Sequence, residues 1–90
     1  MLKTSVKFIN PLGLHARAAA ILVRLAGTFQ SEINIKRTDN FAAADAKSIL
    51  GVLTLAAAKG TELEIVTDGA DENEAMKAVE KAFINGFGEI

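Results

Sequence analysis

Apolar and polar residues alternate in three segments of the chain, a period of two that predicts strands with one buried face. The first segment covers residues 2–8 and ends before Asn10-Pro11. A weaker apolar stretch, from Phe41 to Ala44, follows the Thr38-Asp39-Asn40 turn and predicts a short edge strand. The expected buried positions of the three alternating segments are Leu2, Thr4, Val6 and Phe8, then Ile33 and Ile35, then Leu63, Ile65 and Thr67.

Three other segments repeat apolar residues at intervals of three and four, which predicts helices. The first spans residues 16–26, with Gly27 placed at its C-terminus. A second, shorter helix is expected from Ser48 to Ala57, ended by Gly60, and a third begins at Asp71 and Glu74 with the spacing of a capping box. The expected buried positions are Ala19, Leu22, Val23 and Ala26 in the first helix, and Ala75, Val79, Ala82 and Phe83 in the third.

The predicted order of elements is therefore βαββαβα. Strands with a single apolar face indicate an antiparallel sheet that is covered by helices on one side only. We expect an α/β (α+β) fold of the open-faced β-sandwich type, with a four-stranded antiparallel sheet and three helices on one face. Ninety residues, half of them hydrophobic, suffice for a single domain, residues 1–90.

Composition excludes several classes of function. Ten basic and eleven acidic residues give a formal net charge of -1, so the chain lacks the positive field that binding nucleic acid requires. The sequence holds no cysteine and one histidine, which argues against disulfides and against Cys- or His-based metal sites. It offers no apolar run of the length that a membrane span needs. We expect a soluble, cytoplasmic monomer without cofactor, metal or membrane insertion.

The single histidine, His15, lies where a loop containing Pro11 and Gly13 meets the first predicted helix. The first N–H groups of a helix lack intrahelical partners and carry the positive end of its dipole, so they favour an anion. A phosphoryl group on the ring of His15 would meet the amides of residues 16–18 and the forked guanidinium of Arg17. Imidazole is largely uncharged at pH 7 and is nucleophilic without a dedicated base. The simpler alternative is that His15 is only a surface residue or a helix cap.

A second unusual segment follows Lys47, because no charged residue occurs again until Lys59. A short helix beside a small sheet buries about half of its surface, so some of the apolar side chains here should be exposed. An exposed apolar patch commonly marks a docking surface. The residues concerned are Ile49, Leu50 and Leu53. Arg17 and Arg24, seven residues apart on the first helix, would add a basic face beside them. An unusually buried helix is the alternative.

The motifs GLHAR, residues 13–17, and AKSILGVLTL, residues 46–55, together resemble those of HPr, the histidine-containing phosphocarrier family of the bacterial phosphotransferase system. The resemblance extends over essentially the whole chain and implies an open-faced β-sandwich. It also implies that His15 accepts a phosphoryl group from enzyme I, on the δ1 nitrogen, and passes it to a sugar-specific or regulatory acceptor protein. Arg17 would then stabilise the phosphoryl oxygens. Such a protein carries phosphate without turnover of its own.

The same resemblance places Ser48 on a serine that a dedicated HPr kinase/phosphorylase modifies in many bacteria. From the sequence alone Ser48 is also the expected N-cap of the second helix. A phosphate there would bring about −1.5 to −2 charges to the Ile49, Leu50 and Leu53 surface and weaken docking of enzyme I. One residue departs from the family pattern: Ala18 stands where proline is usual. Because His15 and Arg17 remain, we expect phosphoryl transfer to survive this change.

Two other functions remain open at this stage. An HPr-like regulatory binding protein, in nitrogen or catabolite control, would use the same residues to select a binding partner. A plain interaction or ligand-binding module would leave His15 unreactive. An enzyme with its own turnover is least expected, since no second histidine, cysteine or carboxylate pair stands beside His15 in the sequence.

Overall fold

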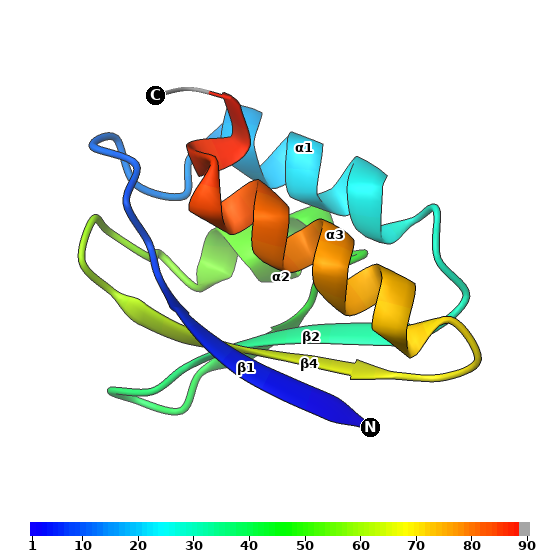
Figure 1. Ribbon diagram of the computed structural model, residues 1–90. Helices are drawn as coiled ribbons and strands as arrows, with labels where there is room; N and C mark the ends of the chain where they lie inside the picture. Colours follow the sequence, from blue (N-terminus) through cyan, green and yellow to red (C-terminus); the bar gives the residue numbers. More distant parts are fainter. Residues whose placement is uncertain (89–90) are drawn as a thin grey trace.

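Four strands form one antiparallel sheet, and all three helices lie against the same face of it (Figure 1). The computed structural model describes residues 1–88. Its elements are β1 (Leu2–Lys7), α1 (Ala16–Ala26), β2 (Glu32–Arg37), β3 (Ala43–Asp45), α2 (Ile49–Thr54), β4 (Glu62–Asp68), α3 (Glu72–Ile84) and a 3₁₀ turn, η1 (Gly86–Gly88). The predicted order and the predicted open-faced architecture are both confirmed.

The strands lie in the order β1-β4-β2-β3, so the last strand in the sequence occupies the middle of the sheet beside β1 and β2. The alternation read from the sequence sets which face is buried: Ile35 of β2 pairs with Ile65 of β4, and both are fully buried beneath the helices. Thr67 is also fully buried, and its hydroxyl donates to the carbonyl of Glu72 at 3.1 Å. That bond satisfies a polar group inside the core.

Three phenylalanines close the core at the end of the molecule where β1 leads into α1. The ring of Phe8 lies 6.1 Å from that of Phe83 and 6.3 Å from that of Phe87, and the last two rings are 4.9 Å apart. All three are buried, and the pairs have the edge-on or tilted geometry that aromatic quadrupoles favour. The sequence pattern anticipated Phe8 and Phe83 but not Phe87, which follows α3.

The predicted edge strand at residues 41–44 is shifted in the structure to Ala43–Asp45. It does lie at the edge of the sheet, paired only with β2. Phe41 belongs to the preceding turn, with a φ of 61°, and its ring is exposed beneath the ammonium of Lys36 at 5.2 Å. The amide of Arg37 donates to the carbonyl of Ala42 at 2.8 Å and closes this turn. The predicted strand begins too early because Phe41 is apolar but belongs to the turn.

The second helix is shorter than the sequence predicts. It begins after Ser48 as expected but ends at Thr54, with Leu55 as C-cap and Ala56 at a φ of 51°. Gly60 consequently lies beyond the helix instead of ending it. The carbonyls that would prolong the helix accept hydrogen bonds from elsewhere: Arg37 donates to Leu55 and Ala56, and the Leu14 amide donates to Ala57. Tertiary contacts decide this boundary.

The capping box predicted for the third helix does not form, because the Asp71 side chain makes no hydrogen bond to the start of that helix. Asp71 is the N-cap residue but caps nothing in its own helix. Its carboxylate instead accepts from the amides of Gln30 and Ser31, at 2.8 and 2.9 Å, and from the Ser31 hydroxyl at 2.5 Å. The carboxylate of Glu72 accepts from the Gly69 amide at 3.1 Å. Asp71 thus joins the loop between α1 and β2 to the start of α3.

Candidate functional site

His15 is the N-cap residue of α1. Its backbone is extended, with φ −84° and ψ −179°, and its carbonyl accepts the amide of Ala19 at 2.9 Å. The ring Nδ1 accepts a hydrogen bond from the backbone amide of Arg17 at 3.2 Å. The ring is therefore held over the first turn of the helix, where amides point outward without intrahelical acceptors. The same contact makes His15 a cap, so the two interpretations of this residue are compatible.

The loop that carries His15 is fixed at three points. Phe8 exchanges backbone hydrogen bonds with Gly60 and Thr61, at 2.7 and 2.8 Å. The side-chain amide of Asn10 donates to the carbonyl of Gly86 at 2.7 Å. The amide of Leu14 donates to the carbonyl of Ala57 at 2.8 Å. Because the residue before His15 is bonded to a different part of the chain, the position of the ring depends on that segment too.

Gly13 meets the same segment at close range. Its φ is +74°, and a Cβ built on it would lie 3.0 Å from the carbonyl oxygen of Ala57. A side chain at this position would therefore meet both backbone strain and a steric clash with main-chain atoms. The glycine of the GLHAR motif thus allows the His15 loop to pack directly against residues 57–58.

A shallow depression of about 310 Å³ opens beside the histidine ring. One side is formed by the loop before α1 and the other by the turn after α2. Its lining residues are Pro11, Leu12, Gly13, Leu14, His15, Ala56, Ala57 and Ala58. The ring of His15 is half-buried, not enclosed in the core. The depression is open and borders the N-cap residue of α1.

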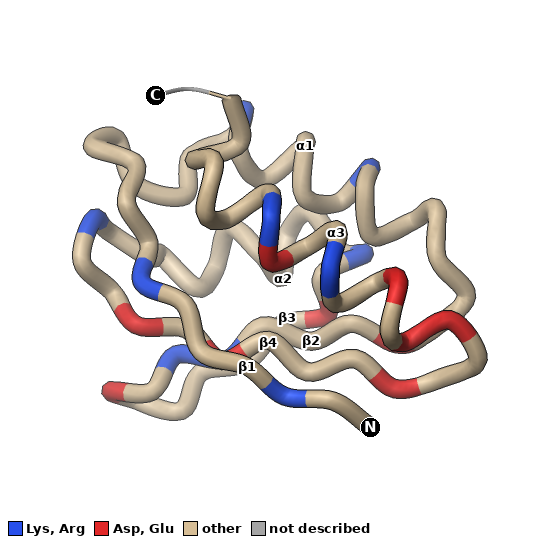
Figure 2. The backbone as a smooth tube through the Cα atoms, viewed as in Figure 1, with Lys and Arg blue, Asp and Glu red and all other residues tan. Residues whose placement is uncertain are grey.

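The two arginines predicted to share the wet side of α1 are both exposed. Arg17 lies in the first turn, and its own backbone amide is the one that donates to His15, whereas Arg24 lies in the last turn. Figure 2 shows both basic positions along α1. Arg24 also complements the negative end of the helix dipole. Acidic residues are absent from the first turn of α1, so nothing there competes with an anion.

The apolar side chains of α2 divide between core and solvent. Val52 is fully buried, whereas Ile49 is 38% exposed and Leu50 is 77% exposed. Leu53 is partly buried against the core. The expectation of exposure is thus confirmed for Ile49 and Leu50 and only partly met for Leu53. Ser48 is exposed beside them, and its Oγ accepts from the Gly51 amide at 3.2 Å as the predicted N-cap.

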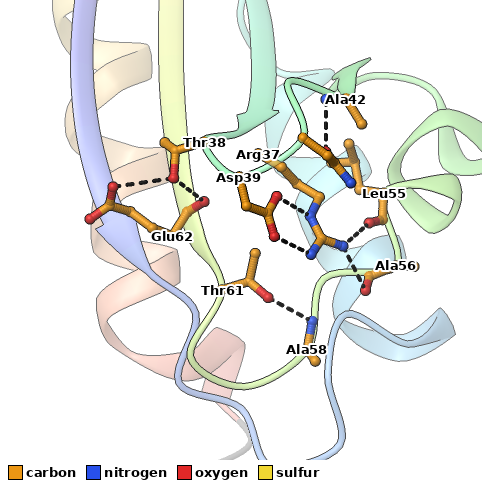
Figure 3. A network of polar contacts seen from close by, with 10 residues as sticks. Arg37, Thr38, Asp39, Ala42, Leu55, Ala56, Ala58, Thr61 and Glu62 are labelled. Carbon is orange, nitrogen blue, oxygen red and sulfur yellow. Dashed lines mark hydrogen bonds and ion pairs between the residues drawn. The ribbon is translucent and has the colours of Figure 1, made fainter.

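Arg37 and Asp39, which the sequence did not single out, form an ion pair close to the depression (Figure 3). The guanidinium of Arg37 donates to the Asp39 carboxylate and lowers the pKa of that carboxyl below its ordinary value of 3.8. It also reaches the turn after α2. The sequence does not reveal this contact, because Arg37 binds main-chain carbonyls and residues 56–58 of the turn are all alanines without polar side chains. Residues 1–88 contain no cluster of three or more His, Cys, Asp or Glu side chains suited to a metal ion.

Comparison with known proteins decides the family. A family model described as "PTS HPr component phosphorylation site" matches residues 2–85. The phosphocarrier protein HPr of Neisseria meningitidis serogroup A is 48% identical over 89 residues, which cover 99% of this chain and 98% of that protein. The chain belongs to the HPr family, the phosphocarriers of the phosphotransferase system.

Solved HPr structures agree with this assignment. A crystal structure of HPr from Thermoanaerobacter tengcongensis superposes with a TM-score of 0.91 at 34% identity, covering 100% of this chain and 99% of that one. The catabolite repression protein Crh of Bacillus subtilis, described as a domain-swapped dimer, gives a TM-score of 0.73 at 31% identity over 96% of this chain and 97% of that one. Family membership implies partner proteins within the phosphotransferase system. No helix in the described part of this chain has the length and apolarity to cross a bilayer.

Proposed function

We propose that this chain accepts a phosphoryl group from enzyme I on Nδ1 of His15 and hands it to a sugar-specific or regulatory acceptor protein. The observation that carries the proposal is the placement of Nδ1, 3.2 Å from the Arg17 amide, on a residue that lines an open depression beside the start of α1. An imidazole nitrogen held there can be approached by a phosphorylated partner from solvent.

The transfer exchanges one phosphorus–nitrogen bond for another. The lone pair of His15 Nδ1 attacks the phosphorus of the donor phosphohistidine, and the donor nitrogen leaves with the electron pair of the broken bond. Nδ1 then no longer accepts from the Arg17 amide, and a phosphoryl oxygen takes over that donor. The amides of the first turn and the guanidinium of Arg17 stabilise the dianion by charge-assisted hydrogen bonds. Because these donors are prearranged, little reorganisation is needed in the transition state.

The surface that meets enzyme I comprises Ile49, Leu50 and Leu53 of α2 together with Arg24 of α1. The two helices contact each other on the sheet, which supports a single surface with apolar and basic parts. A partner of matching chemistry has an apolar contact area with acidic residues around it. The depression and His15 lie beyond the opposite end of α2 from Ser48, as the lining by residues 56–58 indicates.

Ser48 is proposed as the site of regulatory phosphorylation by an HPr kinase/phosphorylase. Its side chain is accessible, and its neighbours Ile49 and Leu50 are the most exposed apolar residues of α2. A phosphate at Ser48 retains acceptor oxygens for the Gly51 amide at the start of the helix. It also places negative charge against an acidic partner, so docking is weakened while His15 itself is unchanged.

The likeness to Crh supports an alternative function, that of a regulatory HPr-like protein. The greater identity to phosphocarriers, 48% against 31%, supports the carrier function. A test of acceptors separates the two: a carrier passes its phosphoryl group to a sugar-specific component, and a purely regulatory protein does not.

The decisive assay incubates the protein with phosphoenolpyruvate and catalytic enzyme I, followed by mass spectrometry. We expect one acid-labile phosphoryl group, located on His15. His15→Ala should gain none, and Ser48→Ala, the matched control, should be labelled like the parent. A parent protein that gains no phosphoryl group, or one that is labelled equally in His15→Ala, would contradict the proposal.

A further inference from the structure

We propose that Arg37, held in place by Asp39, is a positioning residue for phosphoryl transfer at His15. Arg37 fixes the turn after α2, and this turn sets the position of the loop that carries His15. The inference rests on the proposed function but concerns residues that lie outside the motifs of the family resemblance.

The guanidinium of Arg37 binds two partners at once (Figure 3). On one side, Nε and Nη2 donate to the Asp39 carboxylate at 2.9 and 2.7 Å, the bidentate geometry that orients an arginine most firmly. On the other side, Nη1 donates to the carbonyl of Leu55 at 2.9 Å and to that of Ala56 at 3.3 Å. The Arg37 side chain is only 18% exposed, so it is packed against the turn and does not extend into solvent.

The turn after α2 depends on partners of this kind. The carbonyls of Leu55 and Ala56 lie just past Thr54, the last residue of α2, and a cation is favourable at this end of a helix. Ala56 adopts the left-handed conformation, with φ 51°, which is unfavourable for a residue with a Cβ. α2 has no basic residue of its own in its last turn. Arg37, from the end of β2, supplies the missing positive charge and donors.

The turn is directly bonded to the histidine loop. Ala57, the residue after Ala56, accepts the amide of Leu14 at 2.8 Å, and Gly13 packs against the same carbonyl. Ala56, Ala57 and Ala58 form one side of the depression, and His15 lies on the other. A displacement of the turn therefore moves Leu14 and changes both the orientation of the His15 ring and the space for the phosphoryl group. Small displacements of this kind have large effects on transfer rates.

A purely structural role for Arg37 predicts a different result. Loss of the ion pair would then lower stability alone, and a folded variant would transfer phosphate normally. The Arg37 side chain donates to Asp39, Leu55 and Ala56, not to the surface of Ile49, Leu50 and Leu53, so we expect binding of enzyme I to be preserved. The distinguishing quantities are the maximal transfer rate and the half-saturating concentration of phosphorylated enzyme I, measured well below the melting temperature of each variant.

The experiment compares Arg37→Gln, Arg37→Lys and Asp39→Asn with Lys36→Gln as the matched control. Lys36 is the neighbouring cation of β2, and its ammonium lies over Phe41, not over the turn. Arg37→Gln should lower the maximal transfer rate about tenfold with an unchanged half-saturating concentration. Arg37→Lys should recover part of the rate, because one ammonium cannot hold both the carboxylate and the carbonyls. Asp39→Asn should have a smaller effect than Arg37→Gln, and Lys36→Gln none.

Hydrogen exchange of the Leu14 amide gives a readout that does not need phosphate. Exchange should be faster in Arg37→Gln than in the parent, whereas amides in the centre of β4 should be unaffected. Parent-like transfer by a folded Arg37→Gln, a rise in the half-saturating concentration at unchanged rate, or an equal loss in Lys36→Gln would overturn the inference. Should Arg37→Gln fail to fold, the Arg37→Lys and Asp39→Asn rates decide. A parent that accepts no phosphate refutes the proposed function; a parent that does, with parent-like variants, refutes only the positioning role.

Discussion

Substitutions at Ser48 should move stability and docking in opposite directions. The Ser48 Oγ accepts the Gly51 amide at 3.2 Å, and this is the side-chain cap of a helix of only six residues. Replacing serine by alanine removes the acceptor and costs about 1 kcal/mol. For a domain of this size a loss of about 1 kcal/mol lowers the melting temperature by roughly 4–8 °C.

Aspartate at the same position should behave differently. It is as good an N-cap as serine, and its charge at the start of a helix adds about 0.3–1 kcal/mol. The first turn of α2 contains no other acidic residue that would repel it. We therefore expect Ser48→Asp to melt at or above the temperature of the parent. In phosphotransfer, its charge beside Ile49 and Leu50 should raise the half-saturating concentration of enzyme I, while Ser48→Ala stays close to the parent.

Thermal unfolding by circular dichroism and single-turnover transfer from phosphorylated enzyme I test the two parts independently. If Ser48→Asp were destabilised as much as Ser48→Ala, the capping argument would be wrong. If Ser48→Asp accepted phosphate as fast as the parent at low enzyme I concentration, the charge argument for regulation would be wrong. In the transfer assay, Ser5→Asp on the solvent face of β1, opposite Glu64, is a control for a negative charge added on the outer face of the sheet.

Three further predictions concern acid stability, steering and the first helix. Hydrogen bonds from Ser31 and Gln30 lower the pKa of Asp71 from its ordinary 3.8 to about 2, so its stabilising effect is complete above pH 4 and is lost as the pH falls towards 2. Asp71→Asn should flatten this part of a urea-unfolding profile taken against pH; a parent-like profile would contradict the assignment. Arg24→Glu should slow association with enzyme I more at low than at high salt in stopped-flow measurements, and equal slowing would argue against steering. Ala18→Pro should change the transfer rate by less than about tenfold, because a first helical turn tolerates proline; a change from inactive to active would refute this.

The fold was predictable because its determinants are local and periodic. Alternation assigned β1, β2 and β4 their buried faces, and the spacing of three and four assigned α1 and α3. The placement of His15 before a helix and the cap at Ser48 also followed from neighbouring residues, since a cap depends on amides two or three positions away. Exposure of Ile49 and Leu50 followed from the absence of charged residues in this segment, because a helix on one face of a sheet cannot bury all of its apolar side chains.

Tertiary structure decided what distant residues do to one another. The carboxylate of Asp71 binds a loop some forty residues earlier instead of its own helix. Arg37 donates to two carbonyls just after α2, eighteen and nineteen residues away in the sequence. The carbonyl of Ala57 accepts the amide of Leu14 in the loop before His15. No periodicity encodes such contacts, because they depend on which strand lies beside which helix once the sheet order is formed. The sequence by itself therefore determined the proposed nucleophile, His15, and the helix that follows it, whereas only the packed structure determined which distant residues fix their positions.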